Sequence, residues 1–225
     1  LFSTIIKDNL NISIIDTQNT INDKFISGMN NLIEINPQRK DDLISAKPFL
    51  AMLIGIKIQD ERLSNKEEFV NHMHTSLRTF IECACTKSNR SEKPFILILE
   101  DMHWIDKMSY NALKFILDTL NLKTKRGEDD LSLPIIITTY RNEYSIEDKL
   151  IEITNFTNLQ LNHLTKESSH ELINLLSTKA NIPTKKKKEL YSKSQGNPFF
   201  IEEWINLYND NDKSTEATTD FDIPD

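Results

Sequence analysis

The spacing of apolar residues divides the chain into a helical first part, a middle with two strand-like runs, and a helical end. Residues 2–56 contain short apolar patterns of helical period, which predict helices interrupted at Pro37 and again around Pro48. Ser64 and Glu67 have the spacing of a capping box and precede a longer pattern. This pattern predicts an amphipathic helix, whose apolar face consists of Phe69, Met73, Leu77, Phe80, Ile81 and Ala84.

Two continuous apolar runs in the middle of the chain favour β-strands. Residues 95–99 read Phe-Ile-Leu-Ile-Leu, and residues 133–139 form a second short run of this kind. Between them, Ser109 is placed to cap a helix with its own apolar face. Continuous apolar runs are typical of parallel strands covered on both faces. The order strand, helix, strand therefore predicts an α/β fold with a parallel sheet and a right-handed crossover.

After the second run the pattern becomes wholly helical. Thr165 and Thr184 are predicted to cap two successive helices, Gly196 to end the second of them, and Pro198 to open a third. The last residues are polar and acidic with one lysine, as is typical of a linker. The predicted organisation is an α/β core over 1–161, a small helical lid over 162–208 and an acidic linker over 209–225.

Composition limits the classes of partner. The net charge of −7 disfavours binding of nucleic acid through a general electrostatic attraction, and the lysine run 185–188 is interpreted as a solvated helix face. No apolar run reaches the roughly 18 residues of a membrane span, so we expect no membrane partner. Cys83 and Cys85 point to different sides of a predicted helix, which fits a reducing, cytoplasmic location. Because the sequence begins with Leu1 rather than Met, we interpret it as an internal piece of a longer protein.

Two adjacent acids follow the first apolar run. A strand that ends in Glu100 and Asp101 places both carboxylates at the carboxyl edge of a parallel sheet, where α/β folds bind ligands. One carboxylate at such an edge can hold Mg²⁺ through water while its neighbour orients the water that attacks a γ-phosphate. The alternative is that Asp101 and Asp106 only cap the helix that follows.

Three segments together resemble a known family. Residues 99–106, Leu-Glu-Asp-Met-His-Trp-Ile-Asp, resemble the Walker B strand of STAND-type AAA+ ATPases. Residues 135–141, Ile-Ile-Ile-Thr-Thr-Tyr-Arg, are similar to the sensor-1 strand of that family, and 195–203, Gln-Gly-Asn-Pro-Phe-Phe-Ile-Glu-Glu, to its Gly-x-Pro motif. Such modules occur in large adenylyl and guanylyl cyclases, multidomain kinases and transcription regulators. The resemblance covers about residues 94–207 and implies part of a P-loop NTPase sheet with flanking helices.

The resemblance implies a role for five residues. Glu100 corresponds to the acid on the Mg²⁺ side, and Asp101 to the position that orients the attacking water. Arg141 corresponds to a sensor of the γ-phosphate, and Gly196 and Pro198 to the hinge beside the adenine of ATP. Many AAA+ relatives have Asp before Glu. The reversed order shortens the reach of the second acid by about 1.5 Å and implies slow hydrolysis.

We therefore expect an ATP-binding, slowly hydrolysing switch that uses Mg²⁺ and passes its state to a covalently linked output domain, a cyclase or a kinase. Self-association is a further expectation. The phosphate-binding motif G-x-x-x-x-G-K-[ST] does not occur in these 225 residues, and we expect it upstream of Leu1. Two alternatives stay open. One is a degenerate scaffold that binds proteins but no nucleotide, and the other is an all-helical protein-binding platform.

Several candidate residues also have ordinary structural interpretations. Arg141 could form a surface ion pair, while His103 and Trp104 are interpreted as packing and loop-orienting residues. His72 and His74 diverge by roughly 200° around a helix, so they are expected to be exposed or half-buried rather than zinc ligands. The remaining aromatic cluster is expected to be core, and its members are Phe199, Phe200 and Trp204.

Overall fold

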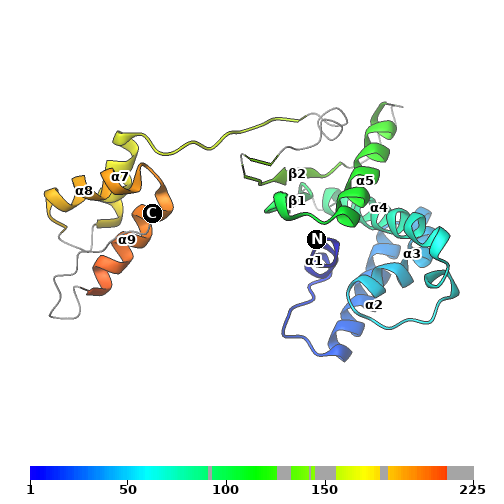
Figure 1. Cartoon of the computed structure of the whole chain (residues 1–225). Helices are drawn as coiled ribbons and strands as arrows, with labels where there is room; N and C mark the ends of the chain where they lie inside the picture. The colour runs from blue at the N-terminus through cyan, green and yellow to red at the C-terminus, as the bar shows by residue number, and fades with distance from the viewer. Residues whose placement is uncertain (91–92, 126–132, 142, 145–155, 178–181, 212–225) are drawn as a thin grey trace. The chain divides into compact units, whose positions relative to one another are not determined.

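The computed structural model divides the chain into two compact units (Figure 1). The core unit is Leu1–Phe156, and the helical unit is Thr157–Asp225. The core unit is mixed α/β, mostly helical with a small two-stranded parallel sheet. The residues that the structure describes are 1–90, 93–125, 133–141, 143–144, 156–177 and 182–211.

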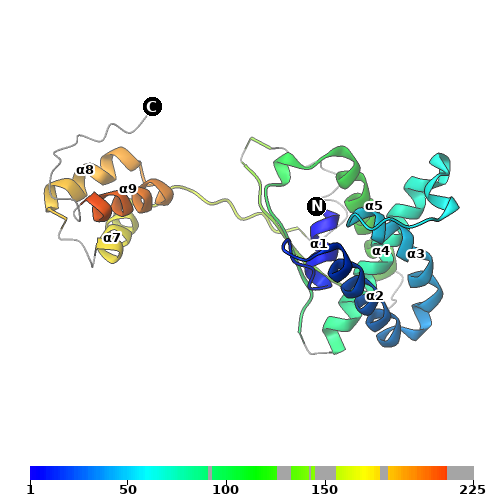
Figure 2. The ribbon, with the colours of Figure 1, turned by 90° about the horizontal axis from the view of Figure 1, so that it is seen from below.

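The core unit is built mainly from helices. They are α1 (Phe2–Asn9), α2 (Gln18–Ile35), α3 (Lys40–Leu53), α4 (Lys66–Arg90) and α5 (Lys107–Lys125), with 3-10 turns η1 (Pro37–Arg39), η2 (Glu61–Leu63) and η3 (Met102–Trp104). Of these helices, α2, α3 and α5 contact α4, while α1 contacts α3 (Figure 2). The predicted stripe of α4 is confirmed by the burial of Met73, Leu77, Phe80, Ile81 and Ala84. The helix begins at Lys66, so Asn65 rather than Ser64 precedes it.

The predicted interruption around Pro48 is wrong, because α3 runs through this residue. Proline inside a helix removes one backbone hydrogen bond and typically costs about 3 kcal/mol. Pro48 and the three residues after it are all buried, and α3 packs closely along α4. The burial of these side chains in the tertiary structure offsets the local cost of the proline. The helix propensity of a single residue does not include this contribution.

The middle of α4 is buried on all sides. Glu82 and Cys83 are 6% and 1% exposed, and Cys85 is 1% exposed. Neither cysteine is in a disulfide, and burial raises the pKa of the Cys85 thiol to about 12, which makes it a poor nucleophile. Glu82 Oε2 lies 2.8 Å from Nη1 of Arg39, so one buried charge is paired with a residue of η1. Asn36 joins the same region by donating from Nδ2 to the carbonyls of Leu32 and Cys83.

The two strands form a parallel pair, as predicted. They are β1 (Ile96–Leu99) and β2 (Ile135–Thr138), in a register that sets Ile96 opposite Ile135 and Leu99 opposite Thr138. On one face of the pair, Leu97 and Leu99 are buried in the same core cluster as residues of α4 and α5. The other side, the apolar sheet face, is open, so the prediction of cover on both faces is wrong for the described residues. Its side chains are 47–62% exposed and are Ile96, Ile98, Ile135 and Ile137.

The helical unit contains α7 (Lys166–Leu176), α8 (Thr184–Ser194) and α9 (Pro198–Asn211). The predicted cap of α7 is confirmed, because the hydroxyl of Thr165 accepts a hydrogen bond from the Ser168 N–H at 3.2 Å. Pro198 opens α9 as predicted. Thr184 is wrong as a cap, since Pro183 holds that position and Thr184 is the first helical residue. The core of the unit consists of Ile173, Ile182, Leu190, Ile201 and Ile205.

The aromatic cluster of α9 is divided between core and surface. Trp204 packs against the core of the helical unit, but Phe199 is 65% and Phe200 43% exposed. The prediction that all three are core is therefore wrong for the two phenylalanines. They lie in the first turn of α9, before the helix reaches the buried positions Ile201 and Ile205.

Candidate functional site

The candidate site is the carboxyl edge of the strand pair. Glu100 and Asp101 follow β1 directly, and both are exposed. Thr139 follows β2 and lies beside them, because the register continues beyond Leu99 and Thr138. The structure thus places the two predicted acids at the edge where parallel sheets bind ligands.

Hydrogen bonds of Thr139 connect the turn after β1 to the end of β2. Its N–H donates to the carbonyl of Leu99 at 3.0 Å, and its own carbonyl accepts from the Met102 N–H at 2.8 Å. Its hydroxyl accepts from the Asp101 N–H at 3.1 Å. Thr139 is absent from the residues predicted for the site, although its position at the end of the second apolar run is a usable signal.

Asp101 has an unusual backbone conformation. Its φ is 53° and its ψ 42°, in the left-handed region that non-glycine residues rarely adopt. Its side chain is 75% exposed, and Oδ1 lies 4.0 Å from Nδ1 of His103. Local strain of this kind persists only where the surroundings hold it, and it occurs often at functional sites. Here the bond to Thr139 holds the Asp101 N–H.

His103 and Trp104 form the turn that follows. The His103 side chain is 11% exposed, whereas Trp104 is 75% exposed. The two rings lie with their centroids 5.2 Å apart. His72 and His74 are half-buried as predicted. The His72 ring stacks on Phe49, and the His74 ring lies tilted against Phe115.

Asp106, not Ser109, caps α5. Asp106 Oδ1 accepts a hydrogen bond from the Ser109 N–H at 2.9 Å, and α5 begins at Lys107. The prediction of Ser109 as the cap is wrong by three residues, because both residue types are good caps and the helix starts at the earlier one. Of the two acids considered as caps, Asp106 does cap a helix. Asp101 precedes η3 but makes no side-chain capping bond.

Asp106→Ala is expected to destabilise the core unit by about 1 kcal/mol, the usual value of a helix cap. Bonds from the Ser109 hydroxyl and N–H hold the pKa of Asp106 below its ordinary value. The contribution of the charged cap is therefore present above the ordinary carboxyl pKa and is lost as the pH falls through the lower folded value. Chemical unfolding of the variant and the parent at neutral and acidic pH measures this. Asp106→Asn is the control, since it keeps a neutral cap, and an Ala effect independent of pH would contradict the assignment.

Arg141 lies beyond the end of β2 and is exposed. Its carbonyl accepts from the Tyr144 N–H at 2.9 Å, which turns the chain after the strand. No carboxylate of the described residues lies within ion-pair distance of its guanidinium, so the surface ion pair considered as an alternative is not seen there. Arg141 follows the strand that neighbours the one ending before Glu100 and Asp101, and its role as a phosphate sensor stays a prediction.

Gly196 and Pro198 belong to the helical unit. Gly196 has φ +81°, and its carbonyl accepts from the Leu164 N–H at 2.8 Å. Before it, Gln195 also has a positive φ, of 49°, and its carbonyl lies 3.0 Å from Nδ1 of His163. These contacts give Gly196 and Pro198 clear structural roles, in ending α8 and starting α9. A role beside adenine remains a prediction.

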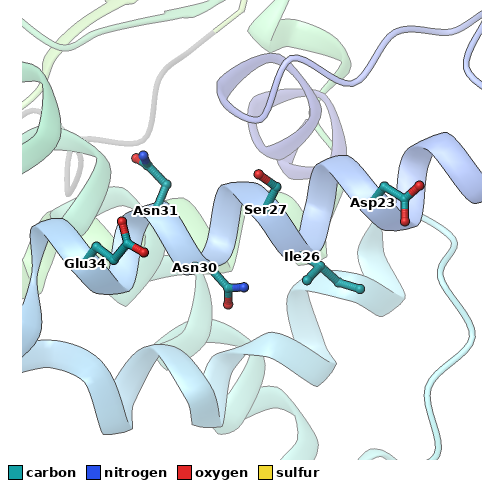
Figure 3. A pocket seen from close by; sticks show the side chains of 6 residues that line it. All are labelled: Asp23, Ile26, Ser27, Asn30, Asn31 and Glu34. Atoms are coloured by element: carbon teal, nitrogen blue, oxygen red, sulfur yellow. The ribbon is translucent and has the colours of Figure 1, made fainter.

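A shallow hollow runs along the exposed side of α2, in the core unit but on a single helix (Figure 3). None of the residues that line the hollow belongs to the strand edge, so the hollow is unrelated to the candidate site. Its lining is Asp23, Ile26, Ser27, Asn30, Asn31 and Glu34. Within the described part of the chain, no cluster of three or more His, Cys, Asp or Glu side chains is placed to hold a metal ion. Nor does any described helix combine the length and apolar character needed to cross a bilayer.

Comparison with known proteins leaves the family open. No protein family, curated protein or solved structure matches the chain. The residues at the strand edge are therefore the main basis for assigning a function.

Proposed function

We propose that this chain is the Walker B part of an ATP-binding, slowly hydrolysing regulatory module of the STAND type. The observation that carries the proposal is the pair Glu100 and Asp101, exposed at the carboxyl edge of β1 beside the end of the parallel strand β2. Arg141 follows β2 and supplies a cation without a described ion-pair partner. A cation at this edge stabilises the negative charge of a transferring phosphoryl group.

The residues present fit Mg²⁺. The ion prefers hard oxygen ligands and usually takes only one or two carboxylates from a protein, the rest coming from water and phosphates. Glu100 would hold it, and the bound ion would neutralise charge on the phosphates. The absence of a larger acidic cluster among the described residues is consistent with this mode. Asp101, one residue farther, would orient the attacking water.

The test is equilibrium binding of Mg-ATP to the full-length protein, because the phosphate-binding motif is absent from these 225 residues. Glu100→Gln and Arg141→Ala are each expected to weaken binding by about tenfold, since each removes a charge that faces the nucleotide. Asp101→Asn is expected to retain binding and to lose hydrolysis. The control is Glu61→Gln, which makes the same chemical change at an exposed carboxylate in η2, away from the strand edge. Failure of the folded parent to bind Mg-ATP would refute the proposal.

A scaffold that binds proteins but no nucleotide is the second candidate. The open apolar sheet face favours it. Lack of a G-x-x-x-x-G-K-[ST] motif in the full-length protein would favour it further. Under this proposal, the full-length protein does not bind Mg-ATP, and substitution of Glu100 changes nothing that can be measured with nucleotide. The same binding experiment therefore separates the two candidates. The linked cyclase or kinase, and transmission of the nucleotide state to it by closure of the helical unit, belong to the first proposal only.

A further inference from the structure

His103 is a polar residue with an 11% exposed side chain, and the ATPase proposal does not explain its role. Both ring nitrogens are buried and have no hydrogen-bond partner among the described residues. Leaving a buried polar atom without a partner is destabilising, so such atoms in native proteins usually have a specific purpose. The nearest described acceptor with a formal charge is the Asp101 carboxylate, 4.0 Å from Nδ1.

The backbone of Asp101 is held on both sides, so only its side chain can change this distance. Its N–H donates to the Thr139 hydroxyl at 3.1 Å, and its carbonyl accepts from the Trp104 N–H at 2.8 Å. The carboxylate itself is 75% exposed and free to turn. A distance of 4.0 Å allows an ion pair but exceeds a hydrogen bond, so the carboxylate has to turn toward the ring to accept from Nδ1–H.

We infer that His103 is a positioning residue for Asp101. In solution, His103 Nδ1–H donates to Asp101 Oδ1 and fixes the direction of the carboxylate, while Oδ2 is left for the attacking water. Burial fixes the position of the imidazole, and the hydrogen bond from the imidazole fixes the direction of the carboxylate. The exposed turn therefore carries an acid with a defined orientation. This inference rests on the proposed ATPase function for its purpose, but the hydrogen bond itself can be tested without nucleotide.

The competing interpretation is that His103 only packs, as expected from the sequence. The ring contact with Trp104 at 5.2 Å supports such a role. Substitutions of different shape separate the two interpretations. Phenylalanine keeps a ring without a donor, asparagine places an amide N–H near the position of Nδ1, and glutamine places one near Nε2.

The first experiment detects the hydrogen bond. Long-range ¹H–¹⁵N correlation spectra of the chain, labelled in histidine, report which ring nitrogen of each imidazole carries the proton. At about pH 8.5, above the usual titration range of imidazole, His103 is expected to be protonated on Nδ1. Asp101→Ala should move the proton to Nε2, and Glu100→Gln should leave it on Nδ1. The signal is assigned with His103→Gln, and a tautomer that is the same with and without Asp101 would overturn the inference.

The second experiment measures hydrolysis and Mg-ATP affinity separately in the full-length protein. His103→Phe is expected to lower kcat about tenfold with little change in affinity, and His103→Asn to restore most of the loss. His103→Gln should behave like Phe. Equal kcat in the parent and His103→Phe would overturn the positioning role even if the hydrogen bond is present. A parent that binds no Mg-ATP refutes the ATPase proposal and, with it, the catalytic purpose of the bond, while the spectra still decide whether the bond exists.

Discussion

Gly196→Ala is expected to destabilise the helical unit by about 3 kcal/mol, which combines a left-handed backbone with a steric clash. Glycine is needed at φ +81°, and a Cβ added there would lie 2.3 Å from the carbonyl oxygen of Leu164. That oxygen belongs to backbone and cannot turn away as a flexible side chain could. A small core seldom provides more than about 3–5 kcal/mol, so most of the stability of the helical unit is expected to be lost.

Denaturant unfolding monitored by the fluorescence of Trp204 measures this effect. The chain has two tryptophans, one in each unit, and the exposed Trp104 can be replaced by phenylalanine to leave a single reporter. Gly55→Ala is the matched control. Because Gly55 lies in the core unit, its loss is measured with Trp104 as the reporter in a Trp204→Phe background. Gly55 has φ +86° but no atom within 4 Å of an added Cβ, so only the backbone cost of about 1–2 kcal/mol is expected there. Equal losses at the two glycines would show that the contact with Leu164 is unimportant.

Arg39→Met is expected to destabilise the core unit by about 3 kcal/mol, the lower end of the cost of breaking a buried ion pair. Methionine keeps the apolar stem but removes the partner of Glu82, whose side chain is only 5% exposed. The guanidinium of Arg39 also lies 3.4 Å from the Thr79 hydroxyl, which loses this contact. The loss is placed at the lower end because Arg39 is 24% exposed and Arg78 lies 3.8 Å from the same carboxylate.

Urea unfolding in a Trp204→Phe background, with Trp104 as the reporter, measures this second effect. Arg39→Met combined with Glu82→Met is expected to recover about 1 kcal/mol, since the double variant removes the unpaired Glu82 carboxylate but also takes the 3.8 Å ion pair from Arg78. Asp42→Asn is the control. Asp42 also pairs with Arg39 but is 58% exposed, so its loss should stay below about 1 kcal/mol. If Arg39→Met costs no more than Asp42→Asn, the buried pair contributes little to stability.

Elements were predictable from the sequence where one local signal dominated. The two apolar runs form the parallel strands, the long stripe forms α4, and Thr165 and Pro198 open helices as expected. Errors arise where two local signals are equivalent or where packing decides. Asp106 and Ser109 are equally good caps, and only the actual start of α5 distinguishes them. The helix through Pro48 is not predicted because the cost of proline is local, whereas the burial that offsets it comes from α4.

The candidate site was predictable in part for similar reasons. Acids directly after an apolar run identify a strand end, so the positions of Glu100 and Asp101 follow from the sequence. Thr139 and His103 could not be found in this way, because their significance lies in contacts. The three backbone and hydroxyl bonds of Thr139 depend on the strand register, and the burial of His103 depends on how the turn folds. Residue type alone determines neither.

The apolar sheet face has a thermodynamic consequence that does not depend on what covers it. Four isoleucines, two from each strand, keep apolar surface in contact with water. Covering such surface lowers the heat capacity, because the water that hydrates it is released. Any association that covers these strands, whether with another segment, another copy or another protein, should therefore show a reaction enthalpy that becomes more negative as the temperature rises.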